Sequence, residues 1–202
     1  MNEANARVFL DKAKSFEHEW YPHWTMALYT GMRNEELYAL RWHNVNIDER
    51  LIYVRESWTK QDGFKELTKT CYDRVVEIAP PLVILLKELK LKSYDSVFVL
   101  PRINDWDTGR QAEMLRIFLR GIGLPEVTFH NLRASWATIT LSKGVDIVTV
   151  MKMGGWKSIK TLEQHYLRLS GFDIKGATDK LNFHNPEKIN PKVIDLQKSS
   201  NL

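Results

Sequence analysis

Only one stretch of the chain, from Val45 to Pro80, has the character of β-strands. Its segments RLIYVRES and DRVVEIAP are rich in β-branched residues that roughly alternate with polar ones, and they flank the polar stretch WTKQDGFKELTKT. This pattern predicts a small antiparallel sheet of two or three strands. Because the rest of the patterned chain has helical periodicity, we expect a mostly helical α+β domain with one small sheet.

Helical periodicity covers most of the remaining chain before Gly171. From Ala6 to Trp20, apolar residues recur at steps of three and four, as in an amphipathic helix. The next helix is expected to end at Gly31, because glycine readily takes the left-handed conformation after a helix end. We expect further helices over residues 34–42, 81–90, 109–123, 130–144, 146–153 and 159–169, and a short extended piece over 96–101.

The C-terminal part of the chain loses this periodicity. We expect residues 1–170 to form one domain and residues 171–202 to form a polar tail that is disordered or docks on a neighbouring protomer.

Cys71 is the only cysteine, which excludes an intrachain disulfide and a metal site built from several cysteines. No apolar run is long enough to span a bilayer, so we expect a soluble, cytoplasmic protein. The net charge of +4 is compatible with nucleic-acid binding but is not specific for it.

The segment TGMRNEELYALRW places a charged pair just after a helix end. Arg33 follows the helix-ending glycine, and Glu36 lies three residues further on, near enough to hold its guanidinium. Taken alone, the segment is more typical of a surface ion pair that contributes little.

The segment HNLRASW places His130 and Arg133 on one face near the start of a helix. An arginine donates two parallel hydrogen bonds to phosphate oxygens, and a histidine can move a proton near neutral pH. The alternative interpretation is a capping histidine beside a solvated arginine.

Two further side chains carry candidate chemistry. Lys69, near a strand, can reach a DNA backbone or act as a general acid, although Lys60 and Lys65 are alternatives in the same region. Tyr166 is a candidate nucleophile, but a phenol with a pKa near 10 needs neighbouring cations or a base to be activated. A lone tyrosine at helical spacing is usually structural.

Four segments in the same order resemble the motifs of the tyrosine recombinases, the phage integrase family. TGMRNEELYALRW resembles their first arginine motif, TKT followed by DRVVEI their hairpin lysine strand, and HNLR their His-x-x-Arg motif. GGWKSIKTLEQHYL resembles their closing motif, in which a histidine or tryptophan precedes the nucleophilic tyrosine. The resemblance extends from about Trp24 to Leu167 and implies the C-terminal catalytic-domain fold of these enzymes over residues 1–170.

The resemblance implies a metal-independent and ATP-independent reaction in which Tyr166 attacks a DNA phosphodiester and forms a 3′-phosphotyrosyl bond. Arg33 and Arg133 would hold the phosphate, with Glu36 orienting Arg33. Lys69 would protonate the departing 5′-oxygen.

Two more positions follow from the same motifs. His130 would assist proton movement, and Trp156 would complete the pocket by packing or by a hydrogen bond from its indole nitrogen. The resemblance implies no cofactor.

Three features depart from the family pattern. Trp156 and Tyr166 are ten residues apart, where the family usually has nine, and His165 occupies the ninth place. The insert WTKQDGFKEL lengthens the hairpin and leaves Lys60 as a second candidate for the lysine. The DNA-clamping helical domain that usually precedes the catalytic domain is expected to be absent from this chain.

The expected partner is double-stranded DNA, on which such enzymes assemble as tetramers on paired sites, with accessory DNA-bending or excision proteins. The expected location is the cytosol of a prokaryote or of a phage-infected cell.

Two alternatives to this function remain open. One is relaxation of supercoils by a type IB topoisomerase with nearly the same pocket. The other is a DNA-binding regulatory module that does not cleave, which the ten-residue spacing favours.

Overall fold

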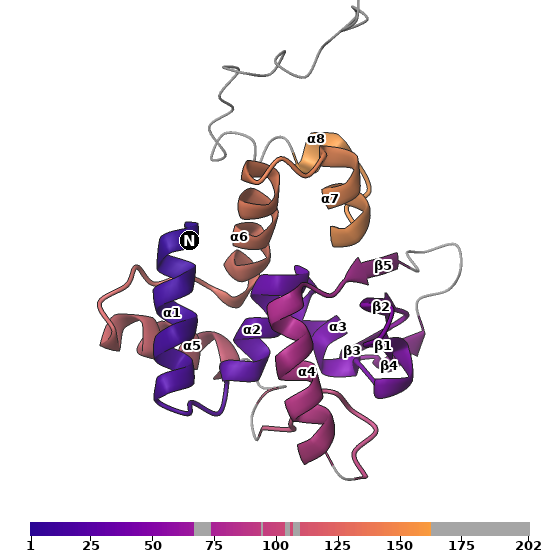
Figure 1. Ribbon diagram of the computed structural model, residues 1–202, viewed down its shortest axis with the longest axis horizontal. Coiled ribbons are helices and arrows are strands. Elements are labelled where there is room, and N and C mark those ends of the chain that lie inside the picture. Colours follow the sequence, from indigo (N-terminus) through magenta and orange to yellow (C-terminus); the bar gives the residue numbers. More distant parts are fainter. Residues whose placement is uncertain (67–73, 94, 104–105, 107–109, 163–202) are drawn as a thin grey trace, which may run out of the picture. The chain divides into compact units, whose positions relative to one another are not determined.

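The part of the chain that the structure describes is mainly helical (Figure 1). In this computed structural model it comprises residues 1–66, 74–93, 95–103, 106 and 110–162, all within the unit Met1–Gly171. The helices are α1 (Glu3–Ser15), α2 (Tyr21–Thr30), α3 (Asn34–Ala39), α4 (Pro80–Lys92), α5 (Arg110–Gly121), α6 (Phe129–Ser142), α7 (Ile147–Gly154) and α8 (Ile159–Leu162), with a 3₁₀ turn, η1, at Trp42–Asn44. None of these helices is long and apolar enough to cross a membrane.

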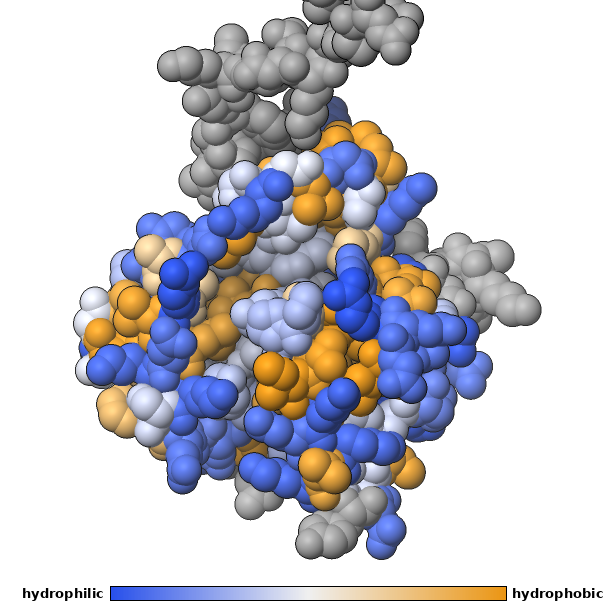
Figure 2. Space-filling view, in the orientation of Figure 1, coloured by the Kyte–Doolittle hydropathy of each residue, from blue (hydrophilic) through white to orange (hydrophobic). Residues whose placement is uncertain are grey.

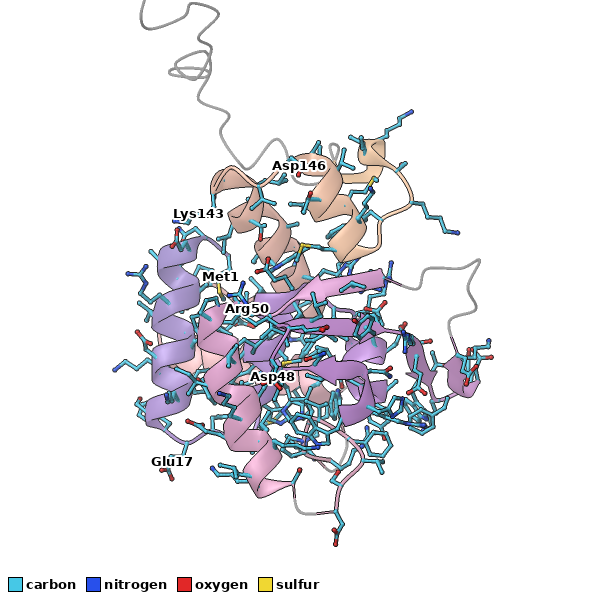
Figure 3. All side chains as sticks on the ribbon, turned by 45° about the vertical axis from the view of Figure 1, so that its right-hand side comes forward. Met1, Glu17, Asp48, Arg50, Lys143 and Asp146 are labelled. Atoms are coloured by element: carbon cyan, nitrogen blue, oxygen red, sulfur yellow. The ribbon has the colours of Figure 1, made fainter. Side chains whose placement is uncertain are left out.

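The first helix is shorter than its periodicity predicted. α1 ends at Ser15, whereas the apolar pattern predicted a helix that continues to Trp20. Glu17, which is labelled at the lower end of α1 in Figure 3, has a positive φ of 48°. The N–H of His18 donates to the carbonyl of Ala13 at 3.0 Å, which closes the helix end. Trp20 is buried, but from the turn before α2 and not from α1.

The end of α2 agrees with the prediction. Gly31 is its C-cap residue, with a left-handed φ of 62°, and its N–H donates to the carbonyl of Ala27 at 3.1 Å. A Cβ at position 31 would lie 2.2 Å from Cε3 of Trp136 on α6. Glycine is therefore required both by the backbone conformation and by the close approach of α6.

The strands form two antiparallel sheets and not the single sheet that was expected. β1 (Val45–Asn46), β2 (Leu51–Val54) and β5 (Arg74–Glu77) pair in the order β1-β2-β5. The polar insert forms a separate hairpin of β3 (Glu56–Thr59) and β4 (Gly63–Glu66). Inward and outward residues alternate along β5, so that Arg74 and Val76 are buried while Val75 and Glu77 are exposed.

Within the described residues, the buried apolar side chains form two clusters. The larger one includes Phe9, Trp20, Trp24 and Ile52, and joins α1, α2 and the three-stranded sheet. The smaller one joins α6, α7 and α8 through Trp136, Ala137, Leu141, Val150 and Leu162. The face of the molecule in Figure 2 is mostly hydrophilic, with separate apolar patches between the hydrophilic residues.

An ion pair ties the end of α6 to the start of α1. Lys143, which follows α6, lies beside the start of α1 (Figure 3), and its Nζ is 2.7 Å from Oε2 of Glu3. Both side chains are about half exposed, so this contact contributes little to stability.

Candidate active site

Arg33 is fixed by the first turn of α3. It is the N-cap residue of that helix, and its backbone N–H donates to Oε2 of Glu36 at 2.7 Å. Its Nη1 donates to Oε1 of the same carboxylate at 2.8 Å. The Arg33 side chain remains 40% exposed, whereas that of Glu36 is only 3% exposed. The contact is therefore not the surface ion pair that was the alternative interpretation.

Glu36 is held by a second arginine, which the sequence analysis did not assign to the site. Arg74, the first residue of β5, donates from Nη1 and Nη2 to the two carboxylate oxygens of Glu36, at 2.7 and 2.5 Å. Burial alone would raise the pKa of Glu36, but the hydrogen bonds and charge of Arg74, together with the charge of Arg33, lower it to about 2. Glu36 is therefore ionised at neutral pH in the folded protein.

The turn after α7 is the third part of this arrangement. Nη2 of Arg33 donates to the carbonyl of Gly155 at 3.1 Å, and Nε of Arg74 donates to the carbonyl of Met153 at 2.8 Å. Gly155 ends α7 with a left-handed φ of 70°. Because glycine allows this conformation, the chain turns sharply and presents two carbonyl groups to the two arginines.

Arg133 is anchored to the turn at Gly31 and to the turn after α7. It lies on the buried side of α6, and its Nη1 donates to the carbonyl of Gly31 at 2.6 Å. Its guanidinium carbon lies 4.0 Å from the centre of the Trp156 ring, which is cation–π geometry. Arg33 follows Gly31 by two residues and Trp156 follows Gly155 directly, so both arginines share their supports.

Trp136 extends this arrangement to the smaller core cluster. Its ring stacks on that of Trp156, with the centroids 6.1 Å apart and the planes 12° from parallel. A Cβ at position 154 would lie 1.8 Å from the Trp156 ring, so Gly154 leaves the space that this ring fills. The contact of Trp136 with Trp156 depends on a packing that helical periodicity cannot show.

The other predicted site residues are either exposed or outside the described residues. His130 is exposed in the first turn of α6, three residues before Arg133. Lys69 and Tyr166 lie outside the described residues. Lys60 is exposed in the turn between β3 and β4, and Lys65 pairs with Asp62 across that turn at 3.1 Å.

The described part of this region is a cationic centre. Arg33, Arg74 and Arg133 carry three positive charges, and Glu36 carries one negative charge, which Arg33 and Arg74 contact. Within the described residues, no group of three or more histidine, cysteine or acidic side chains is placed to hold a metal ion. An arrangement of this kind suits an anionic group such as a phosphate.

Comparison with known proteins identifies a family and several relatives. The profile described as "Phage integrase family" matches residues 2–171. The tyrosine recombinase XerA of Pyrococcus furiosus is 30% identical over 159 residues, which cover 76% of this chain and 51% of that protein. The integrase of Salmonella phage P22 is 23% identical over 144 residues, which cover 69% of this chain and 36% of that protein. The chain thus spans about half of the first relative's length and about a third of the second's.

Solved structures share the fold. The crystal structure of XerA recombinase has a TM-score of 0.66 at 22% identity, and the alignment covers 91% of this chain and 65% of that one. The Tn1549 transposon integrase in complex with circular intermediate DNA has a TM-score of 0.73 at 15% identity, with coverage of 90% and 66%. The expected tyrosine recombinase catalytic-domain fold is therefore confirmed. Because the family profile matches most of its length, the chain belongs to the phage integrase family.

Proposed function

We propose that this chain is the catalytic domain of a tyrosine-type site-specific DNA recombinase or integrase that cuts and rejoins strands through Tyr166. One observation carries the proposal. Arg33 and Arg133 are far apart in sequence, yet both are hydrogen-bonded or stacked onto the turns that contain Gly31 and Gly155. Two arginines that the protein fixes on the same two turns are a preorganised site for the charge of a phosphoryl transition state.

In the proposed reaction, Oη of Tyr166 forms a bond to the scissile phosphorus while the bond from phosphorus to the 5′-oxygen breaks. The phenol proton leaves with the assistance of His130, and the departing 5′-oxygen takes a proton from Lys69. Arg33 and Arg133 donate to the nonbridging oxygens. The products are a 3′-phosphotyrosyl bond and a free 5′-hydroxyl, and attack by a different 5′-hydroxyl rejoins the strands in the new arrangement.

The energy of the phosphodiester is kept in the phosphotyrosyl bond, so rejoining needs no nucleotide. The positive charge that metal ions supply in many phosphoryl-transfer enzymes would come here from the two arginines. Arg133 is only 2% exposed, so the proposal requires that DNA binding uncovers its remaining N–H groups.

The proposed partner is double-stranded DNA. Related structures support this, since the Tn1549 integrase is in complex with circular intermediate DNA and a lambda integrase dimer is bound to a core site. We further propose assembly as a tetramer on paired sites in the cytoplasm, with accessory DNA-bending or excision proteins. Phosphate contacts would supply most of the affinity, which would therefore fall steeply with salt.

The test is covalent trapping on nicked duplexes whose scissile 5′-bridging oxygen is replaced by sulfur. A denaturation-resistant adduct on Tyr166 that is lost in Tyr166→Phe, but kept in the control Tyr53→Phe, supports the proposal. Salt-dependent DNA binding without any adduct would instead identify a module that does not cleave. Relaxation of supercoiled DNA without recombination between two sites would identify topoisomerase activity.

The same substrates distinguish the two candidate lysines. A thiolate leaves without protonation far more readily than an alkoxide, because a thiol has a pKa near 8.5. Loss of the general acid should therefore impair cleavage of the ordinary phosphate but not of the sulfur-containing one. We expect this behaviour for Lys69→Ala, and nearly normal cleavage of both substrates for Lys60→Ala.

A further inference from the structure

We infer that Arg74 is a positioning residue of the active site, which fixes Glu36 and thereby the guanidinium of Arg33 against the turn after α7 without touching the DNA. The inference rests on the proposed function, which assigns Arg33 to the phosphate but gives Arg74 no part.

The contacts of Arg74 show that its hydrogen-bonding capacity is directed at the protein. The side chain is 6% exposed and lies on the inward face of β5. Of its five N–H groups, two are directed at the carboxylate of Glu36 and one at the carbonyl of Met153. A buried guanidinium that is held in this way cannot also donate a planar pair of hydrogen bonds to a phosphate.

Glu36 links Arg74 to Arg33 through hydrogen bonds to both residues. Oε1 of Glu36 accepts from Nη1 of both arginines, and Oε2 accepts from the backbone N–H of Arg33 and from Nη2 of Arg74. The carboxylate is therefore held from two sides and has a single orientation in which all four hydrogen bonds are made. That orientation fixes Nη1 of Arg33.

The turn after α7 connects Arg74 to the second arginine as well. A Cβ at position 155 would lie 2.9 Å from Cδ of Arg74, so Gly155 lets the turn pack directly on this side chain. Trp156 follows immediately and stacks on Arg133. Displacement of Arg74 would therefore disturb the supports of both arginines that are proposed to hold the phosphate.

The critical variant is Arg74→Lys, which keeps the charge but loses the planar, bidentate geometry. The readout is the single-turnover rate of adduct formation at saturating DNA, separately from the affinity for DNA. We expect the rate to fall about 100-fold, because a displacement of about 1 Å at a catalytic group typically costs that much. The affinity should change little, because Arg74 does not contact the DNA.

The matched control is Arg50→Lys. Arg50, labelled in Figure 3, follows the first strand of the same sheet and pairs with Glu77 of β5 at 2.8 Å, but its side chain is 45% exposed. Its Nη2 donates to one oxygen of Glu77, which lies on the same strand as Arg74, and it makes this ion pair away from Glu36. We expect Arg50→Lys to cleave at the wild-type rate.

A pH profile separates positioning from a purely structural role. In Arg74→Met, burial still raises the pKa of Glu36, while the contacts that lower it most are gone. Glu36 should therefore become protonated in this variant as the pH falls from 8 to 5, and cleavage should decline with it. In the wild type, Glu36 stays ionised over this range and causes no such decline. If Arg74→Met does not fold, the rate of Arg74→Lys decides, measured below its unfolding temperature and per folded molecule.

The outcomes distinguish this inference from the proposed function. A wild-type adduct on Tyr166 together with an unimpaired Arg74→Lys overturns the positioning role alone. If the wild type forms no adduct on any DNA that it binds, the proposed function fails, and the positioning role fails with it. A slow Arg74→Lys with normal DNA affinity and a normal Arg50→Lys supports the inference.

Discussion

The substitution Glu36→Gln tests the electrostatics of the site through the stability of the fold. It keeps the size of the side chain but removes the charge that Arg33 and Arg74 contact. The pKa of Glu36 is lowered from its ordinary value of 4.5 to about 2. At about 1.36 kcal/mol per pKa unit, the folded state therefore favours the ionised carboxylate over a neutral group by about 3 kcal/mol.

The pH dependence gives this prediction a definite sign. Because the pKa of Glu36 is lower in the folded state, its contribution to stability is complete above pH 4.5 and is lost as the pH falls towards 2. The wild type should be more stable than Glu36→Gln by about 3 kcal/mol at pH 7, and by about half as much at pH 3. At pH 7 this corresponds to an unfolding temperature that is about 6–12 °C lower for the variant.

The assay is urea unfolding of both proteins at a series of pH values, with Glu77→Gln as the control. Glu77 also pairs with an arginine, but its side chain is 59% exposed, so its substitution should change stability by less than about 1 kcal/mol. A difference between wild type and Glu36→Gln that stays the same from pH 7 to pH 3 would refute the reasoning. So would a loss from Glu77→Gln as large as that from Glu36→Gln.

Three further predictions concern other parts of the structure. Burial lowers the pKa of His23 to about 4, so stability should fall by about 3 kcal/mol as the pH drops from 6.5 to 4 in urea titrations, and His23→Phe should lack this loss. Gly31→Ala should lower stability by about 2 kcal/mol or more, because Gly31 has a positive φ and an added Cβ would meet Trp136. Gly121→Ala is the control and should cause no such loss, because the space around Gly121 is open. Arg133→Ala should reduce adduct formation about 100- to 1,000-fold while gel-shift assays still show DNA binding; normal cleavage would refute its assignment to the phosphate.

The helices and the small antiparallel sheet were largely predictable, because they follow from local patterns. Gly31 ends α2 as its position in the sequence indicated. The end of α1 was not predictable in the same way, because Trp20 continues the apolar period but is buried from a turn. Periodicity shows which residues are buried, but it does not show which element buries them.

The candidate site was predictable only where motifs marked it. Arg33, Glu36 and Arg133 were recognised, but the burial of Glu36 depends on Arg74, which lies 38 residues away in sequence. The alternation in RVVE did contain a signal, because it places Arg74 on the same face as the buried Val76. A charged residue at an inward strand position needs a buried partner, and the sequence alone does not name that partner. Lys69 and Tyr166 stay predictions.

The hydrogen bonds that fix the two arginines span most of the domain, and this has a consequence during protein synthesis. Arg33 depends on a carbonyl 122 residues later, and Arg133 on one 102 residues earlier. At roughly 5–20 residues per second, a ribosome adds Gly155 about 6–24 s after Arg33. A nascent chain therefore lacks the hydrogen bond from Arg33 to Gly155 until the turn after α7 has left the exit tunnel. Chains released early by a premature stop codon before this turn would never form the hydrogen bond from Arg33 to Gly155.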